Sequence, residues 1–243
     1  MKRSLYMATL VLVGIVLTVA TDHARQQRVD LELHDVAENL YMLSNASPEG
    51  MGGGGNTAIF VTSSGVVLVD TKINCYGQDI LAERSGITDR PGTMIINTHS
   101  HYDHSGGNVE FPDTVDFVVH ENARAQMARA SCEPVTNCDA FKGENAKYLP
   151  ETTYADQLTL FSGSDQIDLY HFGRGHTDGD TFVVFRGVRT VHTGDMFARK
   201  GLPFIDAVNR YGSATEFAST IQQRAYGLRG VATVIPGQPT SVH

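Results

Sequence analysis

The chain has 243 residues, of which 41% are hydrophobic and 19% are charged, a composition typical of a folded protein rather than a disordered one. It carries 19 lysines and arginines against 27 aspartates and glutamates, so its formal net charge is −8. Binding to a nucleic-acid backbone requires a basic face, and we therefore expect no nucleic-acid partner.

The N-terminus has the pattern of a secretory signal peptide. Lys2 and Arg3 precede an apolar run over residues 5–20, after which the sequence becomes polar. The run is shorter than the roughly 20 residues that a membrane-spanning helix needs. We expect residues 1–20 to be removed on export, which leaves a periplasmic or secreted domain over residues 29–243 with no stable membrane association.

Short β-rich runs separated by loops dominate the chain after residue 28. Two of these runs, 57–62 and 65–70, are spaced as a hairpin. The order of elements predicts two β-rich layers covered by helices, an α/β sandwich. Strands are predicted at 29–33, 39–43, 57–62, 65–70, 93–98, 115–120, 158–161, 166–172, 181–185, 189–194 and 231–236, and helices at 78–84, 121–130 and 215–228.

Three cysteines are compatible with an exported protein and do not indicate a metal site. Five residues separate Cys132 from Cys138, a loop that a disulfide can close in an oxidising compartment. The spacing leaves the bonded and the free states of this pair open. Cys75 follows a predicted strand and is expected to be a semi-buried thiol. Because no two cysteines have the CxxC spacing, a thiolate zinc site is not predicted.

Four side chains that can bind a metal lie within six residues, directly after the predicted strand 93–98. His99 and His101 are two apart, so an extended chain directs both to the same side, where they can hold one ion. Asp103 and His104 are adjacent and diverge unless the chain turns, so they suit a second centre. Imidazole and carboxylate are suitable ligands for zinc or another first-row divalent ion.

The segment 99–104 matches the HxHxDH motif of the metallo-β-lactamase superfamily. Residues 173–180 resemble the family's second metal motif, whose histidine falls on His176. Residues 192–196 resemble the motif whose aspartate, here Asp195, bridges two metals in glyoxalase II-like hydrolases. The glycine-rich segment 51–56 resembles the loop beside the family's active site. The resemblance spans residues 29–238 and implies an α/β fold, the αββα four-layer sandwich, with the metal site at one edge.

The same resemblance implies a role for each residue of the site. His99, His101 and His176 would hold one zinc ion, and Asp103 and His104 would hold a second, with Asp195 between the two. The family's zinc-dependent β-lactamases carry Cys or Ser at the position of Asp195. This chain is therefore more similar to a general glyoxalase II-like hydrolase than to a dedicated lactamase.

The sequence departs from the family pattern near its end. The family usually completes its site with a histidine in a Pro-Gly-His segment, whereas here Pro236 and Gly237 are followed by Gln238. Glutamine offers a neutral carbonyl oxygen, so Gln238 is expected to be a weak replacement ligand, and the expected number of zinc ions is one or two. The helix that usually follows this motif is also missing, so we expect a truncated copy of the fold or a version with one metal.

These features predict an exported zinc-dependent hydrolase that uses a metal-bound hydroxide on an ester, thioester, lactone or β-lactam-type amide of a small molecule. Asp103 would be its catalytic residue, and Arg199 and Lys200 are candidates for the substrate rim. Two alternatives stay open. One is a non-haem iron enzyme resembling sulfur dioxygenases, with iron held by His99, His176 and Asp195. The other is a degenerate metal-binding protein without turnover.

Overall fold

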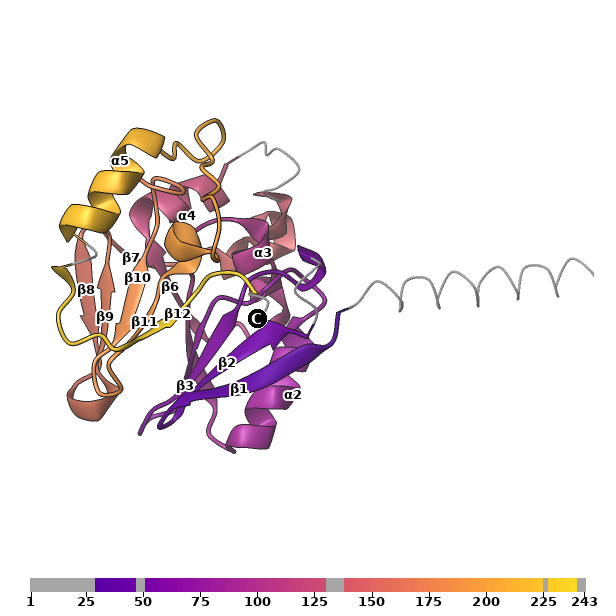
Figure 1. Cartoon of the computed structure of the whole chain (residues 1–243). Coiled ribbons are helices and arrows are strands. Elements are labelled where there is room, and N and C mark those ends of the chain that lie inside the picture. The colour runs from indigo at the N-terminus through magenta and orange to yellow at the C-terminus, as the bar shows by residue number, and fades with distance from the viewer. Residues whose placement is uncertain (1–28, 47–50, 130–137, 225–226, 240–243) are drawn as a thin grey trace, which may run out of the picture.

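The computed structural model describes residues 29–46, 51–129, 138–224 and 227–239, and these residues form two β-sheets with helices around them (Figure 1). The first sheet has seven strands in chain order: β1 Leu31–Ala37, β2 Leu40–Asn45, β3 Thr57–Val61, β4 Val66–Val69, β5 Gly92–Ile96, β6 Asp116–His120 and β7 Thr152–Tyr154. The second sheet has the order β12-β11-β10-β9-β8: β12 Thr233–Ile235, β11 Thr190–His192, β10 Phe182–Phe185, β9 Ile167–Tyr170 and β8 Gln157–Leu160.

The helices are short, and each lies in a connection between two strands of the chain. They are α2 Gly77–Ile87, α3 Tyr102–Ser105, α4 Glu121–Met127 and α5 Ala214–Ser219, which continues into a π-helical turn over Thr220–Arg224. Short 3-10 turns include Gly106–Glu110 and Gly194–Phe197, the latter labelled η6. Within the described part of the chain, no helix combines the length and the hydrophobicity that crossing a bilayer requires. The expected signal peptide and Cys132 of the expected cysteine pair lie outside the described residues. Cys75 is exposed, so the expectation of a semi-buried thiol is wrong.

Each sheet buries apolar side chains on both of its faces. In β4, Val67 and Val69 contact the core between the two sheets, whereas Val66 and Leu68 face the cluster that packs under α2 and α4. This alternation has the period of two that an extended chain imposes. β10 divides its four apolar residues in the same way, between the inter-sheet core and a third cluster that includes Phe217 of α5. The layers are therefore helix, sheet, sheet and helix, as the sequence predicts.

Most predicted elements are present, and the differences include one additional strand and the ends of two helices. β7 was not predicted, because its sequence Thr-Thr-Tyr is short and only its pairing with β6 makes it a strand. The helix predicted over 215–228 is α-helical only to Ser219 and then widens into the π turn. The helix predicted over 121–130 ends at Met127. The predicted hairpin is confirmed, since β3 and β4 pair antiparallel and Thr62 N donates to the Gly65 carbonyl.

The topology brings the predicted metal ligands to one edge of the sandwich. β4, β5 and β6 are parallel neighbours, and the chain leaves β5 directly into the histidine motif. In the second sheet, β11 and β12 are parallel, and they lead into η6 and into the segment containing Gly237 and Gln238. Backbone hydrogen bonds from Gly237 to Phe197 and from Asn56 to Gly237 join these segments. In Figure 1 the segment after β12 accordingly runs towards α3 and the first sheet.

Candidate metal centre

Three imidazoles converge at this edge. His99 and His101 lie in the loop after β5, and His176 lies in the loop between β9 and β10. His99 Nε2 is 3.1 Å from His101 Nδ1, and His176 Nε2 is 3.2 Å from the former and 2.8 Å from the latter. All three residues are at most 2% exposed. The two motifs that the sequence predicts to share one ion are therefore in contact, although 75 residues separate His101 from His176.

The outer nitrogen of each of these rings has an oxygen partner. His101 Nε2 is 2.9 Å from Asp206 Oδ2, and His176 Nδ1 is 2.8 Å from the carbonyl oxygen of Phe204. His99 Nδ1 is 3.0 Å from Thr98 Oγ1, whose own proton goes to a carboxylate oxygen of Asp70. A carboxylate and a carbonyl can only accept, so each ring must donate outward and its converging nitrogen carries a lone pair.

The three lone pairs fit a divalent cation. A tetrahedral zinc with bonds of about 2.0–2.1 Å places its ligands about 3.3 Å apart, close to the 2.8–3.2 Å seen here. Burial, reinforced by the neighbouring imidazoles, holds the pKa of His99 well below its ordinary value, and burial also lowers the pKa of His101. Both rings are thus neutral at neutral pH, the form that binds a metal.

A second cluster lies beside the first and shares His99 with it. Asp103 and His104 both lie in α3, and this turn of helix brings the two adjacent side chains together. His104 Nε2 is 3.5 Å from Asp103 Oδ2 and 3.3 Å from Asp195 Oδ1, which comes from η6. Burial opposes charge on both partners, but the carboxylates outweigh it and raise the pKa of His104, and the imidazoles of His104 and His176 hold the pKa of Asp195 well below its usual range.

The glycine-rich segment packs directly against this cluster. Gly54 has φ +88°, a left-handed conformation that glycine adopts without strain, and a side chain at Gly55 would collide with the imidazole of His104. On the far side of the segment, Lys72 Nζ donates to the Gly55 carbonyl at 2.7 Å. Burial lowers the pKa of Lys72 to about 7, against the opposing effect of Asp70 and Asp103. The resemblance of this segment to an active-site loop agrees with its position.

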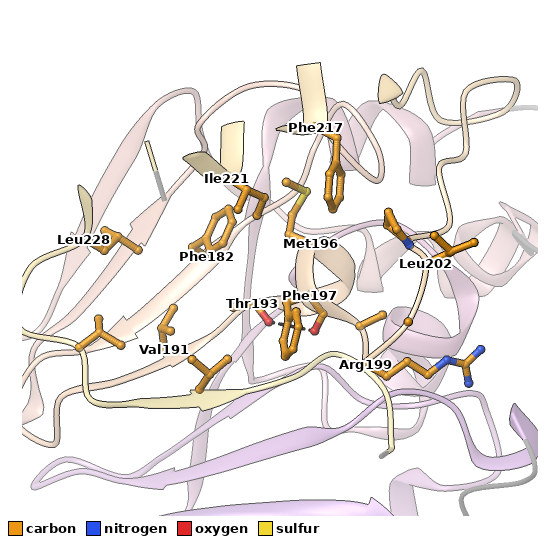
Figure 2. A pocket seen from close by; sticks show the side chains of 15 residues that line it. Phe182, Val191, Thr193, Met196, Phe197, Arg199, Leu202, Phe217, Ile221 and Leu228 are labelled. Carbon is orange, nitrogen blue, oxygen red and sulfur yellow. Dashed lines mark hydrogen bonds between the residues drawn. The ribbon is translucent and has the colours of Figure 1, made fainter. Parts of the chain in front are cut away.

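Arg199 and Lys200 are both exposed and follow η6. Arg199 lines one end of a cavity of about 490 Å³, whose other walls are mostly apolar side chains of the second sheet, η6 and α5 (Figure 2). None of the six expected metal ligands lines this cavity. The expected substrate rim therefore stays a prediction. His192 is fully buried and belongs to neither cluster.

Three residues that hold the site are not predicted by the sequence motifs. Asp70 accepts from Thr98 and is 2.7 Å from His104 Nδ1; it lies at the end of a predicted strand beside the histidine motif, and that placement was an available signal. Asp206 and the Phe204 carbonyl lie in an irregular loop whose sequence carries no periodic pattern. Their roles follow from contacts across long sequence separations.

A four-layer sandwich with a histidine cluster and a carboxylate-containing cluster at one edge defines a class of candidate metal-binding proteins. The family model described as the metallo-beta-lactamase superfamily matches residues 50–237. The chain belongs to this superfamily, as the sequence motifs predict.

Relatives agree with this assignment. A metallo-beta-lactamase type 2 of Elizabethkingia meningoseptica is 24% identical over 166 residues, which are 66% of this chain and 59% of the relative's length. A solved metallo-beta-lactamase from Pontibacter korlensis has a TM-score of 0.69 and 20% identity, and the match covers 86% of this chain and 92% of the other. One from Erythrobacter litoralis has a TM-score of 0.62 and 17% identity, with coverages of 86% and 89%. Because the identities are 20% and 17%, these two structural matches show that the fold is shared and do not extend to function.

Proposed function

We propose that the chain is a metal-dependent hydrolase that cleaves an ester, thioester, lactone or β-lactam-type amide of a small molecule. The observation that carries the proposal is the convergence of three imidazole lone pairs, on His99, His101 and His176, at distances that suit one tetrahedral ion. Three neutral nitrogen ligands favour zinc among the first-row metals that are available to proteins. When bound there, such an ion supplies Lewis acidity and lowers the pKa of a coordinated water from 15.7 to roughly 7.

The chain's own residues would orient water and substrate. The side chain of Asp103 is 25% exposed, against 3% for His101 and 1% for His176. It is thus a partly accessible carboxylate, which can orient the attacking water, accept its proton and return a proton to the leaving group. The ring of Phe204 is 5.7 Å from that of His176 and 6.3 Å from that of His101, and forms an apolar wall there.

Turnover of a substrate panel by the zinc-loaded protein tests the proposal. The panel contains a chromogenic β-lactam, a thioester, an aryl ester and a lactone. We expect hydrolysis that a chelator abolishes and added zinc restores. Asp103→Asn should lower kcat/KM by about 10²–10⁴-fold, the usual contribution of a proton-transfer group. His34→Gln, a change at a partly exposed histidine bonded to Ser44, is the matched control. Full activity of Asp103→Asn would contradict the assigned role.

The iron alternative makes a different prediction from the same site. It requires His99, His176 and Asp195 as the ligand set, and Asp195 Oδ2 is 3.7 Å from His176 Nε2. The shorter distance of 2.8 Å between His176 Nε2 and His101 Nδ1 favours the three-imidazole set. Metal analysis of protein produced without added zinc separates the two: about one iron per chain with oxygen uptake would overturn the hydrolase. Bound zinc without turnover on the panel would instead indicate a metal-binding protein without catalysis.

Export is part of the proposal and is supported by the signal-peptide pattern in residues 1–20. Fractionation of cells that express the full chain, with N-terminal sequencing of the product, tests it. A mature N-terminus near residue 21 in the periplasm or the medium is expected. A cytoplasmic product that keeps Lys2 and Arg3 would contradict export.

A further inference from the structure

The middle of the second cluster is filled by the side-chain amide of Gln238. Its Nε2 is 2.8 Å from Asp103 Oδ2, 2.9 Å from His104 Nε2 and 3.2 Å from Asp195 Oδ2. These three groups are the ones that the sequence resemblance assigns to a second ion. An ion bound by them would lie about 2.0–2.2 Å from each, in the space where the amide nitrogen now lies.

The backbone on both sides of this amide is held firmly. Gln238 N donates to the Ala198 carbonyl at 2.9 Å, and Gly237 N donates to the Phe197 carbonyl at 3.1 Å. Asn56 Nδ2 donates to the carbonyls of both Pro236 and Gln238, at 2.9 and 3.0 Å. Gln238 itself is only 7% exposed. The side chain is therefore presented to the cluster by a fixed segment.

The surroundings of the amide determine which of its two ends faces the cluster. Two of the three groups around the amide, Asp103 and Asp195, are carboxylates that can only accept, and His104 Nε2 is the third. The two negative charges outweigh the single imidazole, so the NH₂ end turns towards them, because the amide oxygen would be repelled by both carboxylates. The nitrogen of a carboxamide has no lone pair to give a metal. In this orientation Gln238 provides hydrogen-bond donors where the family pattern provides a fourth ligand.

We infer that the chain holds a single divalent ion, at the three-histidine cluster, and that the Gln238 amide takes the place of a second ion by hydrogen bonding to Asp103 and Asp195. This inference rests on the proposed metal binding and specifies its stoichiometry. It differs from the expectation that Gln238 is a weak ligand, which requires the amide oxygen to face the cluster.

Counting the bound zinc tests the inference without measuring activity. The full chain is loaded with zinc, dialysed against metal-free buffer and measured by elemental analysis and native mass spectrometry. We expect about one ion per chain in the wild type and in Gln238→Leu, which removes the amide and adds no ligand. Gln238→Glu, of nearly the same shape, and Gln238→His each add a metal-binding atom and should raise the count to about two.

Two further measurements make the result decisive. His176→Ala should lose the ion of the wild type, and cobalt substitution should give a visible absorption about twice as intense in Gln238→Glu as in the wild type. Two ions in the wild type but one in Gln238→Leu would overturn the inference and make Gln238 a ligand. A single ion that survives His176→Ala would overturn it too. A wild-type chain that binds one ion but hydrolyses nothing would refute the proposed function and leave the stoichiometry standing.

Discussion

Among single residues, Asp206 has more influence on the candidate centre than its position in an irregular loop suggests. Its carboxylate fixes the ring of His101, and its backbone nitrogen donates to the carbonyl of His176 at 2.9 Å. The carboxylate also accepts from the backbone nitrogen of Asn209 at 2.9 Å. One residue outside the expected ligand set thus holds the ring of His101 and the backbone of His176. Hydrogen bonding to His101 outweighs burial and lowers the pKa of Asp206, so it remains an acceptor at neutral pH.

Removal of this carboxylate should weaken metal binding. We expect Asp206→Ala to lower the zinc affinity by about 10–100-fold, the usual cost of losing the partner of a ligating histidine. Asp206→Asn should have a smaller effect, because its amide oxygen can still accept from His101. Competition with a chromophoric chelator measures both changes. Asp113→Ala is the control, since Asp113 is exposed and pairs with Lys147. Unchanged affinity in Asp206→Ala, together with a loss in His101→Ala, would show that Asp206 does not position the ring.

Among the elements, the glycine-rich segment 51–56 packs closely against the second cluster. It passes between His104 and the backbone of Gly237, and each of these would be struck by a side chain at Gly55. Gly55→Ala should therefore destabilise the fold by about 1–3 kcal/mol through overpacking. Gly86, near the end of α2, has open space around it, so Gly86→Ala should stabilise by about 0.5–1 kcal/mol. Urea unfolding measures both variants. A Gly55→Ala protein as stable as the wild type would show that His104 can move aside freely.

The sequence predicts well those parts of the site that are local in the chain. His99 and His101 are two residues apart, so their shared direction follows from backbone geometry. The position of Asp206 beside His101 spans 105 residues. Such contacts depend on how the two sheets pack, and no periodicity records them. Strand β7 was missed for the same reason, because its pairing with β6 makes it a strand.

For the molecule as a whole, the two sheets are joined near the site by a pair of stacked histidines. His120 ends β6 of the first sheet, and His171 follows β9 of the second, with ring centroids 3.9 Å apart. His120 Nε2 donates to the Ala155 carbonyl at 2.7 Å, and its Nδ1 accepts from the Asn122 backbone nitrogen, where it caps α4. A protonated ring carries a hydrogen on both nitrogens, so its Nδ1 could not accept from Asn122. The two hydrogen bonds therefore form together only while the ring is neutral.

This arrangement predicts how the stability of the protein depends on pH. Burial, with the nearby His171, lowers the pKa of His120 to about 4, whereas an unfolded chain has a value near 6.5. Between pH 6.5 and 4 the unfolded state binds more protons at this site, so the free energy of unfolding should fall as the pH falls. A single group contributes at most about 1.4 kcal/mol per pH unit to this slope. Above pH 6.5 both states are neutral and the contribution is constant.

His120→Asn isolates this contribution, because asparagine can still cap α4 and does not titrate. Urea unfolding of the metal-free wild type and variant, at several values between pH 4 and 8, gives the two slopes. We expect the curve of His120→Asn to be flatter below pH 6.5 and parallel to that of the wild type above it. His34→Asn, at a partly exposed histidine in β1, should keep the wild-type slope. Equal slopes in His120→Asn and the wild type would show that protonation of His120 does not cause the loss of stability in acid.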